Sequence, residues 1–122
     1  AFTVGIGDSK NVAACDYVGI VSGEKEPDKM KKTGWNIVKS EFVNAPVITD
    51  LPFTLECEVV SFIGCTLIGR IKNIVAREDI LGDDGLPDLT KFSPITFDPF
   101  HHKYIKLGEV VGEAFKEGNK LK

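Results

Sequence analysis

Hydrophobic and polar residues alternate most regularly in the middle of the chain. Phe53, Leu55, Cys57, Val59 and Ser61 fall on one side of an extended segment, and Thr54, Glu56 and Glu58 fall on the other. A period of two is typical of a half-buried strand. The pattern therefore predicts a strand over residues 53–61.

A second strand is predicted over residues 66–75, where isoleucines and valines recur less regularly. Gly64 lies between the two segments, which favours a hairpin that pairs near neighbours in sequence. Gly69, within the second strand, indicates a bulge or a sharp bend of the kind that small barrels use at their corners.

The first half of the chain predicts shorter elements. Residues 2–6 alternate as in a strand, and Asp8 or Ser9 is expected to cap a helix that carries apolar residues at 12–18 and ends within the glycine-flanked segment 19–23. A short second helix is expected over 28–33, after Pro27 and before Gly34. Residues 36–50 are expected to be irregular, apart from a short strand at 47–48.

The second half predicts a helical turn at 77–81, a turn at 82–85, and short strands at 95–97 and 103–107. A final helix is expected from Gly108 to Gly118, with one apolar face formed by Val110, Val111, Ala114 and Phe115. Residues 1–122 therefore form one domain of five or six short strands and a few small helices. This content favours a β-barrel with appended helices.

Composition narrows the class of protein. The 122 residues are 43% hydrophobic and 27% charged, which is typical of a globular domain. The net charge of −3 argues against a nucleic-acid partner, because phosphate neutralisation needs a basic face. No apolar run approaches the roughly 18 residues of a membrane span and no signal peptide is visible, so we expect no membrane partner and a cytoplasmic location.

Three cysteines are too few for a disulfide framework. Cys57 and Cys65 lie eight residues apart on neighbouring strands, so a bridge and a pair of separate thiols both remain open.

Because the chain starts at Ala1 within a strand-like run, we expect it to be a piece of a longer polypeptide.

Most candidate functional motifs in the sequence lack a residue or a spacing that the function requires. Val4-Gly5-Ile6-Gly7 is similar to a dinucleotide-binding turn, but Lys10 stands where a third glycine is needed. His101 and His102 are adjacent, so in an extended chain they point to opposite faces, and the cysteines lack zinc-ligand spacing. No serine lies in a nucleophile elbow. We therefore expect neither a metal site nor a set of catalytic side chains.

The segment from Asp98 to Tyr104 is the strongest candidate for a binding site. After a proline corner it gathers an aromatic ring, two imidazoles, an ammonium group and a phenol. Such a cluster is suited to holding an anion or stacking on a planar ligand. The alternative is a polar loop whose aromatic side chains cover the core.

Several short motifs recur in a fixed order along nearly the whole chain. They are Asp16-Tyr17-Val18-Gly19, Ser22-Gly23, Asp28-Lys29, Thr33-Gly34, Asn44-Ala45-Pro46-Val47-Ile48, Leu55-Glu56-Cys57, Ile68-Gly69-Arg70-Ile71, Phe97-Asp98-Pro99, Tyr104, Leu107-Gly108-Glu109, Gly112, Ala114-Phe115 and Gly118. This series resembles the C-terminal two-thirds of the flavin reductase-like, or flavoredoxin-like, family of FMN-binding split-barrel proteins. The resemblance implies a mainly β, Greek-key split barrel with a few short helices, incomplete at its N-terminus.

The resemblance also implies a homodimer with FMN near the subunit interface. The expected cofactor contacts are His102, at a position where relatives often carry arginine, together with Lys103 and Tyr104. The implied function is an oxidoreductase that passes electrons from NAD(P)H through flavin to an acceptor, such as a partner protein, with no catalytic side chain required. The alternative is a non-enzymatic split-barrel module or fragment that has lost flavin binding.

Overall fold

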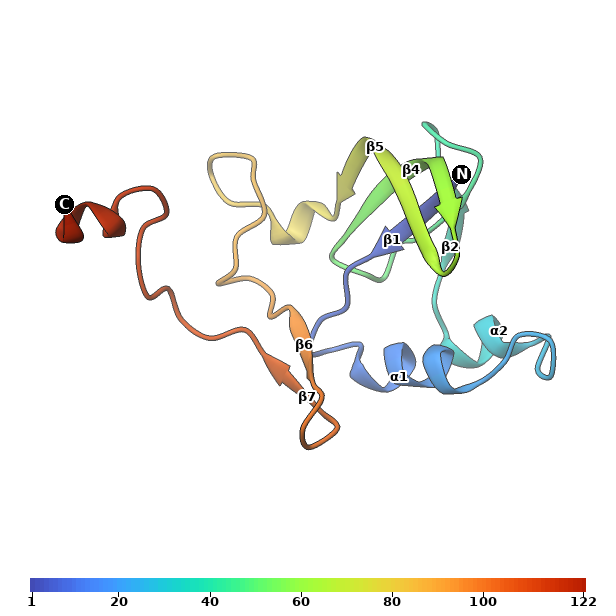
Figure 1. Cartoon of the computed structure of the whole chain (residues 1–122). Coiled ribbons are helices and arrows are strands. Elements are labelled where there is room, and N and C mark those ends of the chain that lie inside the picture. Colours follow the sequence, from blue (N-terminus) through green and yellow to red (C-terminus); the bar gives the residue numbers. More distant parts are fainter.

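A long β-hairpin is the largest element of the structure, a computed structural model that describes residues 1–122 (Figure 1). It consists of β4 (Phe53–Ile63) and β5 (Thr66–Ala76). Gly64 forms the turn with φ = 61°, a left-handed conformation that glycine adopts without steric cost. Strand β1 (Phe2–Gly5) adds to the other edge of β4, so the sheet order is β1-β4-β5 and all pairs are antiparallel.

The two faces of this sheet differ sharply in composition. The register places Val4, Leu55 and Ile74 in one row and Thr3, Glu56 and Asn73 in the next. Because paired residues share a face, one face is apolar and the other is polar. The alternation predicted for β4 is thus confirmed as far as the bulges that shift the register beyond Glu56 and Val59.

At Thr54 and Glu56, the burial of β4 is the reverse of the usual pattern, in which the apolar face is the covered one. Thr54 and Glu56 are only 1% and 2% exposed, whereas Ile74, on the apolar face, is 55% exposed. The polar face is covered because a second hairpin lies against it. This hairpin comprises β2 (Ile37–Lys39) and β3 (Pro46–Ile48), so the prediction that residues 37–39 are irregular was wrong.

Hydrogen bonds make the burial of Glu56 tolerable. Its Oε1 accepts from the Ser40 hydroxyl at 2.6 Å, and its Oε2 accepts from Asn73 Nδ2 at 2.6 Å. The Ser40 hydroxyl oxygen in turn accepts from the backbone N–H groups of Phe42 and Val43. A buried carboxylate left without such partners would be strongly destabilising. This network therefore joins the loop after β2 to the central sheet.

Two short helices follow β1 as predicted. They are α1 (Val12–Ile20) and α2 (Lys29–Thr33), and Gly34 ends α2 in the left-handed region at φ = 72°. Neither Asp8 nor Ser9 is the N-cap of α1, because Asn11 holds that position. Asp8 Oδ1 instead accepts from the backbone N–H groups of Lys10 and Asn11, which tightens the turn before the helix.

The chain after β5 forms the turn η1 (Glu78–Ile80) and a separate hairpin of β6 (Ile95–Asp98) and β7 (Lys103–Lys106). The helix predicted from Gly108 is absent. The chain runs extended there and ends in a short 3-10 helix, η2 (Glu117–Leu121). No neighbouring surface covers an apolar face here, and such packing provides most of a helix's stability.

These elements confirm a mainly β, antiparallel split-barrel fold with a few short helices. In the residues described, the strands form three sheets, of three, two and two strands. The three cysteines are free, with Cys57 buried in β4 and Cys65 exposed at the hairpin turn. None of the helices is long and apolar enough to cross a membrane.

Gly69 is required because the ring of Phe2 lies directly over it, and a Cβ atom there would overlap with that ring. We predict that Gly69→Ala lowers the free energy of unfolding by about 1–3 kcal/mol, the usual cost of overpacking. Urea denaturation measures the change. Gly19→Ala is the control, because nothing lies within 4 Å of a Cβ atom at that helical position. Equal stability losses in the two variants would contradict this role of Phe2.

Candidate functional site

The β6–β7 hairpin carries the three residues that the sequence analysis singled out. In its register Phe97 pairs with Tyr104 and Asp98 pairs with Lys103. Paired residues share a face, and neighbours along a strand alternate. The hairpin therefore presents Tyr104 on one face and Lys103 on the other.

His102 belongs to the same face as Tyr104. Its imidazole stacks on the ring of Phe97 with centroids 6.1 Å apart and planes 11° apart, and Phe97 in turn lies 5.9 Å from the Tyr104 ring. His102 has a left-handed backbone conformation, with φ = 53°. Non-glycine residues in this region are uncommon and concentrate at functional sites. The structure thus brings His102 and Tyr104 together through Phe97 and separates Lys103 from them.

Asp98 organises the turn of this hairpin. Its Oδ1 accepts from the backbone N–H of Phe100 at 2.9 Å, and its Oδ2 lies 3.0 Å from Nδ1 of His101. These contacts lower the pKa of the Asp98 carboxyl below its ordinary value, and the hydrogen bond from Phe100 has the largest effect. The carboxylate is therefore committed to the turn, and His101 is drawn toward it. The imidazole of His102 stays clear of this pair.

Tyr104 is anchored to the first helix. Its hydroxyl donates to Oδ1 of Asp16, in α1, at 2.7 Å. This bond to a carboxylate is the main reason why the pKa of Tyr104 is raised above its ordinary value. The contact joins the hairpin to α1 across 88 residues of sequence.

An apolar cleft of about 450 Å³ opens beside Tyr104, between the hairpin, α1 and β1. Its aromatic wall is formed by Trp35, Phe97 and Tyr104, and its other lining residues are Gly5, Gly7, Cys15, Val18, Ile48, Leu51, Ile95 and Thr96. A predominantly apolar cleft with a few polar groups is the usual form of a small-molecule site.

The polar atoms of this cleft are already oriented. The indole Nε1 of Trp35 donates to Oδ1 of Asn11 at 3.0 Å. The pKa of the Cys15 thiol is raised, first by burial and then by the negative charge of Asp8, so this thiol stays protonated. A Cβ atom at Gly7 would lie 3.0 Å from the Cys15 sulfur, so glycine keeps the floor of the cleft open.

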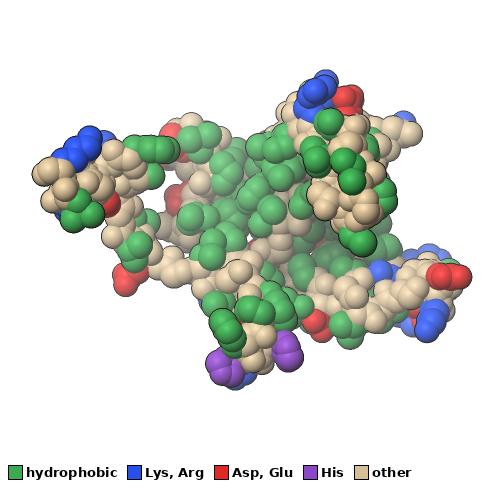
Figure 2. Space-filling view, viewed as in Figure 1, with side chains coloured by type: hydrophobic (Ala, Val, Ile, Leu, Met, Phe, Trp, Pro, Cys, Tyr) green, Lys and Arg blue, Asp and Glu red, His purple; other side chains and the backbone are tan.

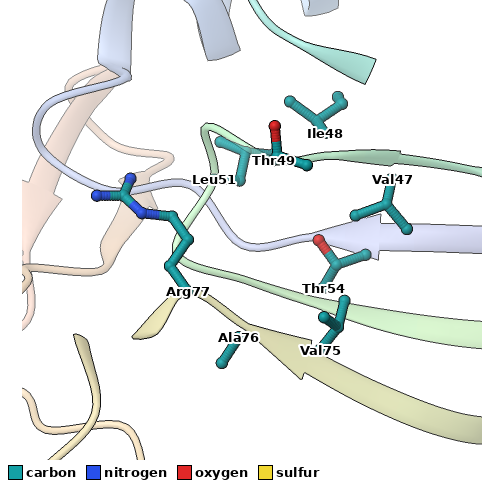
Figure 3. A pocket seen from close by; sticks show the side chains of 8 residues that line it. All are labelled: Val47, Ile48, Thr49, Leu51, Thr54, Val75, Ala76 and Arg77. Carbon is teal, nitrogen blue, oxygen red and sulfur yellow. The ribbon is translucent and has the colours of Figure 1, made fainter. Parts of the chain in front are cut away.

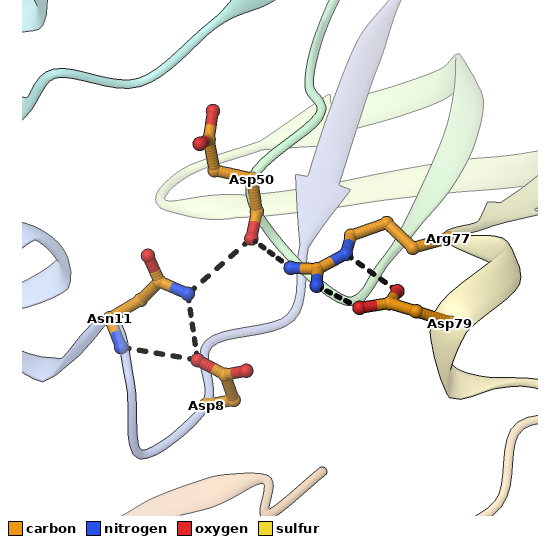
Figure 4. Close-up of polar contacts among 5 residues, drawn as sticks. All are labelled: Asp8, Asn11, Asp50, Arg77 and Asp79. Atoms are coloured by element: carbon orange, nitrogen blue, oxygen red, sulfur yellow. Dashed lines mark hydrogen bonds and ion pairs between the residues drawn. The ribbon is translucent and has the colours of Figure 1, made fainter. Parts of the chain in front are cut away.

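A polar junction behind the cleft fixes the elements that line it (Figure 4). The backbone carbonyl of Asp50 accepts from Arg77 Nη1 at 2.9 Å and from Asn11 Nδ2 at 3.4 Å. The same Asn11 amide donates to Asp8 Oδ1 at 2.7 Å, while Arg77 forms a two-bond ion pair with Asp79. This pair raises the pKa of Arg77 and lowers that of Asp79.

A second, smaller cleft of about 230 Å³ lies on the other side of Ile48 and Leu51, which line both clefts (Figure 3). Its remaining lining residues are Val47, Thr49, Thr54, Val75, Ala76 and Arg77. The guanidinium group of Arg77 points away from the other side chains in Figure 3 and is occupied by Asp79 and Asp50. This cleft therefore offers mainly apolar contact.

The sequence analysis selected candidate residues on this hairpin but did not predict the cleft beside them. Trp35, Cys15 and Phe97 come from distant segments, and no local motif connects them. The one feature of the sequence that could have indicated this cleft was the concentration of aromatic residues around Asp98. The described residues contain no group of three or more His, Cys, Asp or Glu side chains arranged to hold a metal ion.

Comparison with solved structures identifies the fold as that of the flavin reductase-like split-barrel proteins. An FMN-binding domain of a flavin reductases-like enzyme from Shewanella baltica superposes with a TM-score of 0.76 at 11% identity, over 91% of this chain and 62% of its own. At that identity the likeness concerns the fold alone.

Flavoredoxins share sequence as well as fold with this chain. The flavoredoxin of Desulfovibrio vulgaris (Miyazaki F) is 38% identical with a TM-score of 0.88, over 95% of this chain. The flavoredoxin of Methanosarcina acetivorans is 30% identical with a TM-score of 0.85, over 98% of this chain. The resemblance inferred from the sequence motifs is confirmed. The chain spans 63% and 64% of the lengths of these two proteins, less than two-thirds of each.

The remaining comparisons add little about function. An uncharacterized protein of Aeropyrum pernix is 27% identical over 100 residues, which are 79% of this chain and 37% of that protein. No model of a known protein family matches the chain.

The contact between Tyr104 and Asp16 predicts a measurable titration. In a Tyr17→Phe background Tyr104 is the only tyrosine, and we expect its pKa to lie above the ordinary value of about 10. Asp16→Asn should lower that pKa, because the carboxylate no longer disfavours the phenolate. Ultraviolet absorbance of the phenolate measures it. Asp98→Asn, on the same hairpin, should leave it unchanged, and an unaltered pKa in Asp16→Asn would show that the contact does not form.

Proposed function

We propose that this chain binds FMN and serves as a flavin-dependent electron carrier or NAD(P)H:flavin oxidoreductase. The observation that carries the proposal is its similarity to the flavoredoxin of Desulfovibrio vulgaris, which extends over 95% of the chain at 38% identity. The proposal that this chain binds FMN and transfers electrons therefore rests on the class of its relatives. The residues of the β6–β7 hairpin and its cleft supply an independent test of fit.

The side chains present fit the chemistry of this cofactor. His102 and Lys103 offer nitrogen donors suited to a phosphate or to the polar edge of a flavin. Both nearby carboxylates have hydrogen-bond partners of their own: Asp98 accepts from the Phe100 backbone N–H and lies against His101, and Asp16 accepts from Tyr104. The aromatic wall of the cleft suits a planar ring.

Each of the three residues has a limited role in this proposal. His102, held against Phe97, donates to the phosphate or polar edge. Lys103 starts from the opposite face of the hairpin, and its long flexible stem allows the ammonium group to reach around the edge. Tyr104 flanks the ring, with its hydroxyl held by Asp16. Positioning and electrostatics are therefore what this chain contributes.

FMN, when bound, supplies the hydride and electron transfer that protein side chains cannot perform. The proposed electron donor is NAD(P)H, and the proposed recipient is an acceptor protein or free flavin. No residue of this chain needs to act as a general acid or base. We further propose a homodimer with the flavin near the subunit interface, while the cytoplasmic location stays a prediction of the sequence.

Titration with FMN tests the proposal. We expect the purified chain either to carry the visible absorption band of bound flavin or to quench flavin fluorescence with saturation when FMN is added. Riboflavin is the matched comparison, since it lacks the phosphate and should bind more weakly. A colourless chain that takes up no added FMN would reject the proposal in favour of a split-barrel module without flavin.

The proposed contact between His102 and FMN is tested by His102→Ala. Losing one charge-assisted hydrogen bond should weaken FMN binding by about 1–2 kcal/mol, or roughly 5- to 30-fold. His101→Ala is the control, because its imidazole lies against Asp98. Fluorescence quenching gives both dissociation constants. If the His102→Ala value equals that of the unmodified chain, the cluster contributes to packing and not to the cofactor.

A further inference from the structure

Glu56, in β4, is a buried carboxylate without an ionic partner. Figure 2 shows charged side chains mainly at the edges of the molecule in this view, with hydrophobic side chains between them. Glu56 departs from the usual exposure of charged groups, because it is only 2% exposed. Its carboxylate accepts from Ser40 and Asn73, but no lysine, arginine or histidine pairs with it. A buried charge is costly when no opposite charge compensates it, so a cation at this position would be stabilising.

This carboxylate lies at the bottom of a cleft of about 270 Å³. The cleft opens between the β2–β3 hairpin and β5, on the polar face of the central sheet. Glu56 and Ser40 line it and are buried, whereas Lys39 and Glu41 line it and are exposed. The first two residues therefore form its floor and the last two its rim. No residue of this cleft lines the one beside Tyr104, so the two sites are separate.

The walls between the floor and the rim are apolar. They are formed by Val38 of β2, Val47 of β3, Val75 of β5 and Phe42 in the loop between β2 and β3. Val38 pairs with Val47 in the register of the hairpin, so both side chains lie on the same face of it. A molecule in this cleft would therefore meet hydrocarbon along the walls and a negative charge at the floor.

The floor also has acceptor capacity that the chain itself does not use. Asn73 donates to Glu56 through its Nδ2 atom, and its carbonyl Oδ1 has no donor within the chain. Each carboxylate oxygen of Glu56 accepts one hydrogen bond and has room for another. A primary ammonium group has three N–H donors and no acceptor, so it complements these oxygens. A hydrocarbon chain attached to it would complement the walls.

We propose that this cleft binds a small primary amine in its protonated form, with the ammonium group on Glu56 and Asn73 and the hydrocarbon chain against the valines. Its volume lies below the roughly 300–1,000 Å³ of clefts for drug-sized ligands, so the ligand is one short chain. An alkylamine has a pKa close to that of lysine, about 10.4, and is charged at neutral pH. Lys39 and Glu41 offset each other at the rim, so the charge of Glu56 decides the sign of the site.

Titration with n-pentylamine at pH 7, followed by two-dimensional NMR, tests the proposal on the chain without flavin, so its outcome does not depend on the proposed cofactor. We expect saturable shifts of the Asn73 side-chain amide and of the backbone amides of Ser40 and Phe42, with a dissociation constant on the order of 1 mM. n-Pentanol is the matched ligand, because it has the same chain without the charge, and it should bind at least tenfold more weakly. Absence of saturable shifts, or equal binding of the alcohol, overturns the proposal.

Two variants test the place of the amine. Glu56→Gln removes the charge with little change of shape and should weaken pentylamine binding at least tenfold, provided that circular dichroism shows the variant folded. Val38→Lys leaves the buried network intact, since Val38 is 50% exposed, and should weaken binding to a similar extent by placing a like charge at the wall. Pentylamine binding as tight as that of the unmodified chain, in folded Glu56→Gln or in Val38→Lys, overturns the proposal.

Ile37→Lys is the matched control for Val38→Lys. Ile37 is the neighbouring residue of β2 and is 46% exposed, but its side chain alternates to the other face and does not line this cleft. Its change should leave the dissociation constant of pentylamine within twofold of the original value. An equal loss of affinity in Ile37→Lys and Val38→Lys would show a general effect of added charge, and would also overturn the assignment of this cleft.

Discussion

The polar junction centred on the backbone carbonyl of Asp50 fixes the relative positions of the segments around the candidate site. That one oxygen accepts from Arg77, beyond β5, and from Asn11, at the start of α1. These groups are partly buried and satisfy one another, so displacing one of them would cost hydrogen bonds within the junction. The junction thereby sets the position of α1 against the sheet, and so the width of the cleft beside Tyr104.

The central sheet reverses the usual relation between composition and burial. Its polar face is covered by the β2–β3 hairpin, and Glu56 on that face accepts hydrogen bonds from Ser40 and Asn73. Its apolar face stays half exposed, as Ile74 shows. An uncovered apolar face costs free energy in water, so this surface favours contact with further apolar groups.

The candidate site depends on contacts that cross the length of the chain. Phe97 holds His102 and Tyr104 on one face of a short hairpin, and Asp16 anchors that hairpin to α1. A two-stranded hairpin alone is marginally stable in water. The hydrogen bond between Tyr104 and Asp16 therefore helps to hold both the His102 imidazole and the aromatic wall of the cleft in position.

The sequence by itself determined the local elements and the class of fold. The alternation from Phe53, the glycines at 34 and 64, and the ordered series of short motifs depend on neighbouring residues, and each predicted a feature that the structure contains. The helix expected after Gly108 failed because its apolar residues have no surface to pack against within this chain. The tertiary structure alone decided that Glu56 is buried, that Trp35 and Cys15 share a cleft with Tyr104, and that Lys103 turns away from His102. Those facts rest on strand register and on contacts between segments far apart in sequence, which no local pattern encodes.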